Sequence, residues 1–211
     1  MGSYAYLPMS AGKIIPSVFA ESMYLIDGKP FRLSGRNYLL PIYNSDIEEG
    51  LIKSGRQVEK STTLSVKIGN SVILKPHTPT LYVAPRTEQV KMFSKTRLSK
   101  LFRYSQGNFI FKKLMHPDLA NQVYMKEFLN GSEVYLRHCF DEGDNIRGLT
   151  IKELYVDEIQ DIFVDAIPVI KETQSHFTEE ENRATTWYTG TPKTFSNTIE
   201  QLWEESTKNE W

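Results

Sequence analysis

The chain has 211 residues, 40% of them hydrophobic and 24% charged, which are the proportions of a globular domain rather than of a disordered or fibrous chain. Its single cysteine, Cys139, excludes a framework of intrachain disulfide bonds and suits a reducing compartment. The sequence contains no apolar run of about 18 residues, so it predicts neither a membrane span nor a secretory signal, and the net charge of −1 does not by itself indicate a nucleic-acid binder.

The first 30 residues contain glycines, prolines and scattered aromatics without a sustained period, so residues 1–30 are expected to form an N-terminal arm with one short helix near residues 17–25. The segment 31–47 follows and carries Arg32, Arg36 and Tyr38. Such side chains could hold an adenine ring by stacking and cation–π contact, and Arg36 therefore enters the candidate nucleotide-binding set. The alternative is a helix that packs the apolar residues of this segment on a sheet.

The stretch 48–68 is the most informative part of the chain. Leu51 and Ile52 belong to a short apolar strand, a polar loop follows, and apolar residues four apart then predict a helix. A strand, a loop and Lys-Ser/Thr at a helix start form the arrangement of a phosphate-binding loop (P-loop), in which backbone N–H groups hold phosphate oxygens. The candidate nucleotide-binding residues in the loop and the first helical turn are Ser54, Gly55, Arg56, Gln57, Val58, Glu59, Lys60, Ser61 and Thr62.

The loop departs from the consensus GxxxxGK[ST], because the two glycine positions fall on Ser54 and Glu59. Glycine serves there because the chain can need φ > 0 and must approach the nucleotide closely. A glutamate adds strain and brings a carboxylate near the polyphosphate. Three alternatives stay open: an ordinary strand–turn–helix junction, a P-loop with weak nucleotide affinity, or a P-loop whose Glu59 side chain turns away from the phosphates toward a lysine or arginine.

Residues 81–84 predict a short apolar strand, and after Pro85 the apolar residues recur with a helical period. No acidic residue occurs from Gln89 to Pro117. A basic face of this kind could meet a polyanion such as DNA, and the alternative is a solvated helix face. The basic residues of this segment are Lys91, Lys95, Arg97, Lys100, Arg103, Lys112 and Lys113.

A second informative stretch is the apolar run 154–156, which predicts a buried strand and ends in Asp157 and Glu158. Two carboxylates at the end of a central strand are costly unless a cation or a reaction uses them. In nucleoside triphosphatases with an extra catalytic glutamate, the first acid holds Mg²⁺ and the second polarises the attacking water. We expect a helix from Ile159 to about Ile170 after this pair.

A third strand is predicted at residues 185–188, and it leads into Thr189, Gly190 and Thr191. Hydroxyl side chains at the carboxyl end of a strand lie where open α/β sheets bind ligands, so these residues could sense a γ-phosphate. The alternative is a simple Thr-Gly turn. Two further strands are expected at residues 51–52 and 133–139.

Four stretches together resemble the ATPase domain of the large terminase subunit, the motor that packages DNA into tailed-phage and herpesvirus capsids. They are GRQVEKSTT (55–63), YVAPRTEQVKMFSKTRL (82–98), IRGLTIKELYVDEIQDI (146–162) and YTGTPKTFSNTIEQLWEESTKNEW (188–211). The resemblance covers roughly residues 31–211. It implies an α/β P-loop NTPase of the additional-strand catalytic glutamate type, with a mostly parallel central sheet flanked by helices on both faces.

The resemblance also implies roles for individual residues. Lys60 contacts phosphate, Ser61 and Asp157 hold Mg²⁺, and Glu158 orients the attacking water as the catalytic base. Two arginines complete the implied catalytic set: Arg56, close to the phosphates, and Arg147, an arginine finger that acts in a neighbouring subunit's site. For Arg147 the alternative is a surface loop arginine. The implied motif that couples hydrolysis to DNA movement consists of Thr189, Gly190 and Thr191.

The implied function is hydrolysis of ATP with Mg²⁺ to translocate double-stranded DNA into a procapsid in the host cytoplasm. The implied partners are a portal protein, a small terminase subunit and further copies of the chain in a ring on the procapsid, with a monomer expected for the isolated chain and no membrane involved. The family normally continues into a nuclease domain, which we expect to lie outside this chain. Two alternatives remain: a superfamily-2-type DNA helicase or translocase domain, and a non-catalytic P-loop scaffold of a packaging ring.

Overall fold

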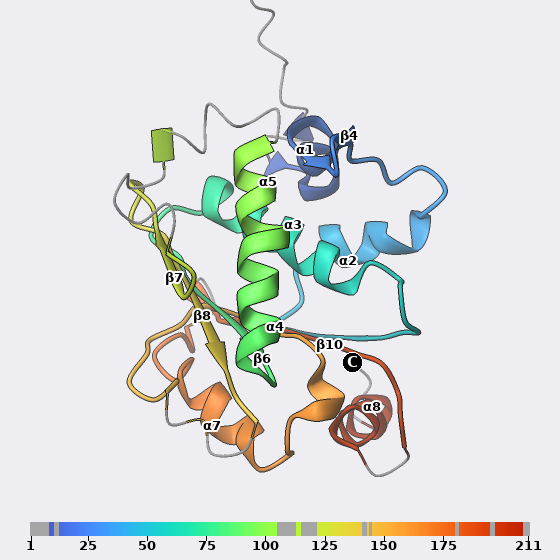
Figure 1. Ribbon diagram of the computed structural model, residues 1–211, viewed down its shortest axis with the longest axis vertical. Helices are drawn as coiled ribbons and strands as arrows, with labels where there is room; N and C mark the ends of the chain where they lie inside the picture. The colour runs from blue at the N-terminus through green and yellow to red at the C-terminus, as the bar shows by residue number, and fades with distance from the viewer. Residues whose placement is uncertain are drawn as a thin grey trace, which may run out of the picture.

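The computed structural model describes residues 9–10, 13–104, 113–114, 122–140, 143, 145–179, 182–194 and 197–208. A six-stranded sheet lies between two groups of helices (Figure 1). In spatial order its strands are β5 (Glu49–Lys53), β10 (Thr185–Gly190), β9 (Glu153–Val156), β6 (Pro79–Ala84), β8 (Glu133–His138) and β7 (Met125–Glu127). Neighbouring strands run parallel except β7, which pairs antiparallel with β8. The predicted α/β fold and mostly parallel sheet are therefore confirmed.

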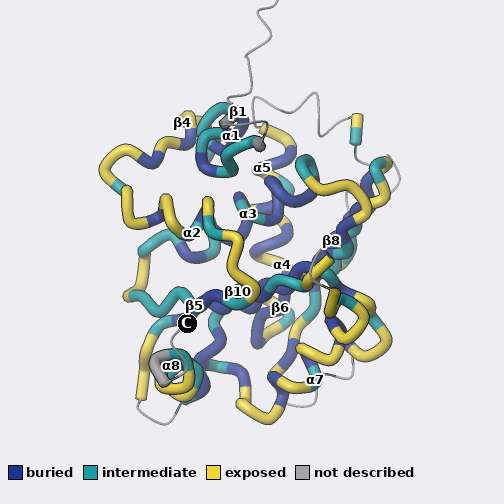
Figure 2. Tube along the Cα trace, turned by 180° about the vertical axis from the view of Figure 1, so that it is seen from behind, coloured by how far each residue is buried: buried dark blue, intermediate teal, exposed yellow. Residues whose placement is uncertain are grey.

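The apolar runs of the sequence become the buried centre of this sheet. All four residues of β9 are buried, and β6 and β10 are buried along five of their six residues. Strands covered on both faces are rich in apolar residues because neither face meets water. Figure 2 shows the strands as a mostly buried layer between the two groups of helices.

Each face of the sheet has its own helices and its own apolar core (Figure 1). One core includes Leu64 and Phe93, and the other includes Ile159 and Ile170. The helices of the first face are α1 (Pro16–Met23), α2 (Leu40–Asn44), α3 (Lys60–Leu74), α4 (Thr87–Met92) and α5 (Ser99–Tyr104), with the π-helical segment η2 (Phe93–Leu98) between the last two. Those of the second face are η3 (Ile159–Asp161), α7 (Ala166–Glu172) and α8 (Thr198–Lys208).

The described residues 13–30 include a short helix that packs against the core. Helix α1 confirms the expected short helix, and its Phe19 and Ala20 belong to the same core as Leu64 of α3. The expected division at residue 30 therefore does not coincide with an edge of the core. The remaining short elements of this region are β1 (Met9–Ser10), β2 (Lys13–Ile14), β3 (Leu25–Ile26), β4 (Lys29–Pro30) and η1 (Asn37–Leu39).

The expected continuous helix from residue 159 to 170 is wrong. The chain forms the single 3₁₀ turn η3, leaves it at Ile162 in an extended conformation (φ −101°, ψ 135°), and begins α7 only at Ala166. The extended backbone buries Ile162 to 2% exposure, and the Ile162 carbonyl accepts a hydrogen bond from the Thr198 hydroxyl. Tertiary packing against α8 therefore overrides the local helical pattern.

The basic helical segment has the predicted apolar face, with Val90, Phe93, Leu98 and Leu101 buried. Six consecutive π-helical residues are rare, and such segments often accompany functional sites. The exposed basic residues are Lys91, Lys95, Arg97, Lys100, Arg103 and Lys113, whereas Lys112 lies outside the described residues. No helix in the described part of the chain has the length and apolarity needed to cross a bilayer.

Candidate nucleotide-binding site

The polar loop 54–59 joins the end of β5 to the start of α3, as the P-loop pattern predicts. The loop passes through two residues in left-handed conformations, Gln57 (φ 62°) and Glu59 (φ 56°), whereas Ser54 does not have a positive φ. Of the two glycine positions of the consensus, only the second therefore uses the conformation that glycine adopts most easily. A non-glycine residue held there costs roughly 1–3 kcal/mol.

Lys60 is buried at the junction of this loop with the end of β10. Its Nζ atom donates hydrogen bonds to the Gly55 carbonyl (2.7 Å) and to Thr191 Oγ1 (2.8 Å). The ammonium group therefore lies inside the curve of the loop, beside the N-terminus of α3. A fixed positive charge and a helix N-terminus at one point are what phosphate oxygens require.

The Asp157 carboxylate connects four elements of the site. Its Oδ2 atom accepts hydrogen bonds from Ser61 Oγ (2.8 Å) and from the Tyr82 hydroxyl (3.1 Å). Its Oδ1 atom accepts hydrogen bonds from Thr189 Oγ1 (2.6 Å) and from the backbone N–H of Glu158 (3.0 Å). Burial and the Asp157 carboxylate both raise the pKa of Tyr82, so this hydroxyl stays a hydrogen-bond donor.

Glu158 follows Asp157 in a left-handed conformation (φ 52°), which turns the chain away from the sheet. Gln160 Nε2 donates a hydrogen bond to Glu158 Oε2, and Gln160 Oε1 accepts one from the backbone N–H of Thr191 (2.9 Å). A Cβ atom on Gly190 would lie 2.5 Å from Gln160 Oε1, so the glycine leaves room for this amide. Gln160 thus connects the second acidic residue to the end of β10.

The Glu59 carboxylate is directed at Arg36, with which it forms an ion pair. Arg36 Nη2 also donates to the Arg32 carbonyl, and the guanidinium lies 5.3 Å from the centre of the Phe31 ring. This geometry matches the alternative in which the Glu59 side chain turns toward an arginine. Tyr38, the other aromatic residue considered for adenine, is 55% exposed.

The structure brings most of the predicted site residues to one edge of the sheet but not all of them. Lys60, Ser61 and Asp157 meet there with Glu158 and with the threonines of β10 and its carboxyl end. Arg56 is exposed in the loop, and Arg147 is exposed in the turn 145–148 between β8 and β9. Of the remaining predicted residues, Gly55 and Gln57 are exposed, Ser54 and Val58 half-buried, and Thr62 buried on α3.

Two residues of the site were not predicted from the sequence. Tyr82 lies inside an apolar strand pattern, where a tyrosine is an ordinary core residue, and its contact with Asp157 depends on the pairing of β6 with β9. Gln160 stands two residues after Glu158, and that spacing is the only signal that could have identified it.

The donors at Ser61 and Asp157 suit a magnesium ion. A hydroxyl oxygen and a carboxylate oxygen converge at 2.8 Å, and the carboxylate is held in place by Tyr82 and Thr189. Mg²⁺ prefers hard oxygen ligands and is commonly bound by one or two protein groups together with substrate phosphates and water. The residues present therefore fit this ion.

A cavity of about 210 Å³ opens beside the two acidic residues. It lies between the ends of β6 and β9 on one side and the α4–η2 segment on the other. Phe93 of η2 stacks on the Tyr82 ring with 3.7 Å between ring centres. The polar residues that line the cavity are Ser61, Tyr82, Gln89, Thr96, Arg97, Asp157 and Glu158.

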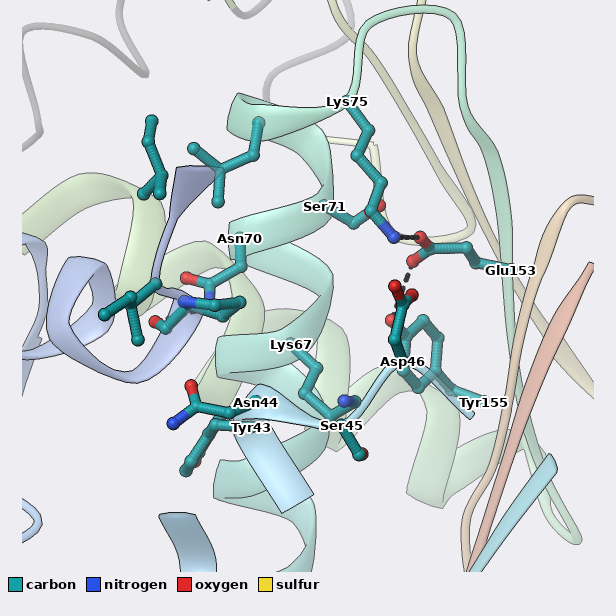
Figure 3. Close-up of a pocket in the computed structure, with 14 residues that line it drawn as sticks. Tyr43, Asn44, Ser45, Asp46, Lys67, Asn70, Ser71, Lys75, Glu153 and Tyr155 are labelled. Atoms are coloured by element: carbon teal, nitrogen blue, oxygen red, sulfur yellow. Dashed lines mark hydrogen bonds and ion pairs between the residues drawn. The ribbon is translucent and has the colours of Figure 1, made fainter. Parts of the chain in front are cut away.

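A larger cavity of about 410 Å³ lies beside the C-terminal half of α3 (Figure 3). None of its lining residues belongs to the loop 54–59 or to the acidic pair. Buried Glu153 accepts hydrogen bonds there from Lys75 (2.7 Å) and from the Tyr155 hydroxyl (2.7 Å). Lys67 donates to the Ile42 carbonyl (2.9 Å), and burial lowers the pKa of Lys67 to about 8. The Lys75–Glu153 contact joins the end of α3 to β9, and the Lys67–Ile42 contact joins α3 to α2.

The strand order defines the class of protein. Strand β10 lies between β5, which leads into the loop 54–59, and β9, which leads into the acidic pair Asp157 and Glu158. This is the P-loop NTPase fold with an additional strand between the two motifs. The chain belongs to the family of ATPase domains of the phage terminase large subunit gpA. The model of this family matches residues 41–211.

Solved structures agree with this fold. The large terminase of bacteriophage HK97 superimposes with a TM-score of 0.76 at 14% identity, over 93% of this chain and 41% of that chain. The large terminase ATPase domain of Thermus phage P74-26 gives 0.60 at 20% identity, over 78% and 66%, and an arginine-to-alanine mutant of it gives 0.58 at 21% identity, over 81% and 68%. This chain spans about two fifths of the HK97 protein. No curated protein matches it.

Replacing Gly190 by alanine should destabilise the fold, because the added Cβ atom would meet Gln160 Oε1 at 2.5 Å and Ile199 Cδ1 at 2.8 Å. Overpacking of this kind costs about 1–3 kcal/mol. Urea unfolding measures the loss. Gly55→Ala is the control, because its nearest neighbour would be Val58 Cγ2 at 3.9 Å. Equal stability of the two variants would contradict the close packing at Gly190.

Replacing Lys67 by methionine should change how stability depends on pH. The pKa of Lys67 falls from 10.5 to about 8 on folding, so between these values the unfolded chain binds more protons and the stability contributed by this residue rises with pH. From pH 7 to pH 10 the unfolding free energy of the parent should therefore rise by roughly 2–3 kcal/mol relative to that of Lys67→Met. Urea unfolding at several pH values measures this, with Lys29→Met as a control for net charge. Parallel curves for Lys67→Met and the parent would contradict the prediction.

Proposed function

We propose that this domain hydrolyses ATP with Mg²⁺ and that hydrolysis moves double-stranded DNA into a viral procapsid. The observation that carries the proposal is the 2.8 Å hydrogen bond between Ser61 Oγ and Asp157 Oδ2. It joins the first turn of α3 to the end of β9, so a triphosphate held by the loop would lie beside the acidic pair. Membership of a terminase ATPase family supports the choice of ATP and of DNA packaging.

In the proposed reaction, the loop 54–59 and the N-terminus of α3 bind the phosphates through backbone N–H groups. Lys60 exchanges its contacts with the Gly55 carbonyl and Thr191 for the β- and γ-phosphate oxygens. Arg56 is exposed in the loop and would approach the same phosphates from the solvent side. Bound Mg²⁺, held through Ser61 and Asp157, supplies neutralisation of the charge on the β- and γ-phosphates.

Glu158 is the proposed base. Glu158 lines the cavity beside Asp157, where the attacking water molecule would be held. This water attacks the γ-phosphorus, its proton passes to Glu158, and the bond to the leaving oxygen of ADP breaks. The hydrogen bond from Gln160 orients the carboxylate for this task.

The carboxyl end of β10 is the proposed coupling element. Thr189 contacts Asp157, Thr191 contacts Lys60, and Gly190 stands between them against Gln160. Loss of the γ-phosphate would change the contacts of Lys60 and Glu158. Lys60 contacts Thr191, just after β10, directly, and Glu158 is connected to Thr191 through Gln160. The exposed basic residues of α4, η2 and α5 offer a surface for the phosphates of double-stranded DNA.

The proposed assembly is a homo-oligomeric ring on the procapsid in the host cytoplasm, in contact with a portal protein and a small terminase subunit. Arg147 would reach the neighbouring subunit's nucleotide, which agrees with its exposed position in the turn 145–148. The alternative of a non-catalytic scaffold assumes that Glu59 closes the phosphate site. The ion pair of Glu59 with Arg36 argues against that assumption. A helicase is disfavoured by the family match.

Lys60→Ala and Glu158→Ala should fail at different steps. Lys60→Ala should weaken MgATP binding at least tenfold, because it removes the cation at the phosphates. Glu158→Ala should still bind MgATP but hydrolyse it about 10²–10⁴-fold more slowly. Titration with a fluorescent ATP analogue measures binding, and phosphate release from rings on procapsids measures hydrolysis. Parental hydrolysis rates in both variants would refute the proposed mechanism.

Mixing subunits tests Arg147. Arg147→Ala chains have an intact base, and Glu158→Ala chains have an intact arginine, so a mixed ring regains complete sites at their shared boundaries. Each variant alone should lose hydrolysis, for Arg147→Ala by roughly a thousandfold, and mixtures should recover part of it. Phosphate release at several mixing ratios measures the recovery, with ring assembly checked for each sample. Absence of recovery at every ratio would argue against an arginine finger.

A further inference from the structure

Glu59 stands where a P-loop has its second glycine, immediately before Lys60. Glycine offers two things at that point: a left-handed conformation at little cost, and the absence of a side chain near the phosphates. The backbone requirement is met here, because Glu59 has a φ of 56° and its carbonyl accepts the N–H of Thr63 (2.8 Å) at the start of α3. The side chain is the remaining difficulty, since a free carboxylate would repel a polyphosphate.

Arg36 meets this difficulty in the structure. Its Nη1 atom bonds the Glu59 carboxylate, with side-chain exposures of 27% for Arg36 and 37% for Glu59. Its Nη2 atom donates to the Arg32 carbonyl, and the guanidinium lies over the Phe31 ring. These two hydrogen bonds direct one donor of each terminal nitrogen of the guanidinium to Glu59 and to the Arg32 carbonyl, which fixes its orientation.

The residues that surround Arg36 in the segment 31–43 include members of the core. Phe31 is 2% exposed and packs edge to face on Tyr43, with ring centres 5.8 Å apart. Leu33 and Leu39, on either side of Arg36, are also buried. These buried residues anchor the backbone on both sides of Arg36. The guanidinium is therefore held next to the loop 54–59.

We propose that Arg36 is a positioning residue for nucleotide binding, which neutralises Glu59 and holds its side chain away from the phosphates. Arg36 and Glu59 together thus replace the glycine of the consensus loop. The inference rests on the proposed function, because it assumes that the loop binds MgATP. It changes the role first expected for Arg36, from a group that touches the nucleotide to one that acts through Glu59.

The two roles predict different nucleotide affinities for variants in which both Arg36 and Glu59 are replaced. If Arg36 acts through Glu59, removing the glutamate charge makes the arginine dispensable. If Arg36 touches the nucleotide, its loss persists whatever residue occupies position 59. Glu59→Gln keeps the length of the side chain and the strained backbone but removes the charge, and Glu59→Gly also removes the strain.

The experiment is a titration of the whole chain with a fluorescent ATP analogue in Mg²⁺. Arg36→Ala should weaken binding at least tenfold, which corresponds to about 1.4 kcal/mol. Adding Glu59→Gln or Glu59→Gly to Arg36→Ala should restore the dissociation constant to within about threefold of the parent value. Rescue by both replacements identifies charge, rather than backbone strain, as the quantity that Arg36 controls.

Arg183→Ala is the matched control. It breaks another arginine–glutamate ion pair, with Glu48, next to the opposite end of β5, and it should leave binding unchanged. Urea unfolding of every variant shows whether the fold is retained, and rescue by a second substitution cannot come from an unfolded chain.

Three outcomes would overturn the inference. Parental binding by Arg36→Ala would show that Glu59 needs no partner. Weak binding by Arg36→Ala and equally weak binding by both double variants would assign Arg36 to the nucleotide itself. In both cases the parent still binds MgATP and the proposed function stands. Absence of saturable binding by the parent would refute the proposed function, and the inference with it.

Discussion

The Asp157 carboxylate is the point on which the site depends. A buried carboxylate is costly unless hydrogen bonds replace the water it has lost, and Asp157 receives them from Ser61, Tyr82, Thr189 and the backbone of Glu158. Three of these donors lie on α3, β6 and β10, so the acid is satisfied only when these elements meet the end of β9. The parallel register of the sheet brings them there, because it aligns the carboxyl ends of the strands.

A contact from outside the sheet explains how the proposed phosphate-binding loop accommodates an unusual residue. In the consensus loop one glycine supplies both the left-handed backbone and the empty space. In this chain Glu59 supplies the backbone conformation, and Arg36, from a segment that precedes β5, neutralises the charge of the Glu59 carboxylate. Separating the two requirements makes the loop dependent on a distant part of the sequence. Phe31, Leu33, Leu39 and Tyr43 anchor this segment in the core, and a loosely held arginine would neutralise the glutamate poorly.

The second acidic residue is controlled by packing of a different kind. Gln160 holds Glu158 with one end of its amide and the backbone of Thr191 with the other, and it fits only because residue 190 has no side chain. The Thr-Gly-Thr sequence is therefore more than a turn, because its glycine makes room for the group that orients the acid. In the same region, Phe93 of the π-helical segment η2 stacks on the Tyr82 ring, and the Tyr82 hydroxyl donates to Asp157. Tyr82 therefore connects the basic helical segment to the acid.

The sequence by itself determined the parts that depend on local patterns. Apolar runs identified the main strands, Lys60 and Ser61 marked the helix start, and the order of the motifs indicated the family, which the comparison confirmed. The tertiary structure alone decided the break at Ile162, the packing of α1 against the core, and the contacts of Tyr82, Gln160 and Arg36. Each of these features either joins residues from different elements or depends on packing against a neighbouring helix. A local pattern reports which face of an element is apolar, whereas the partner that a polar side chain meets depends on strand order and register.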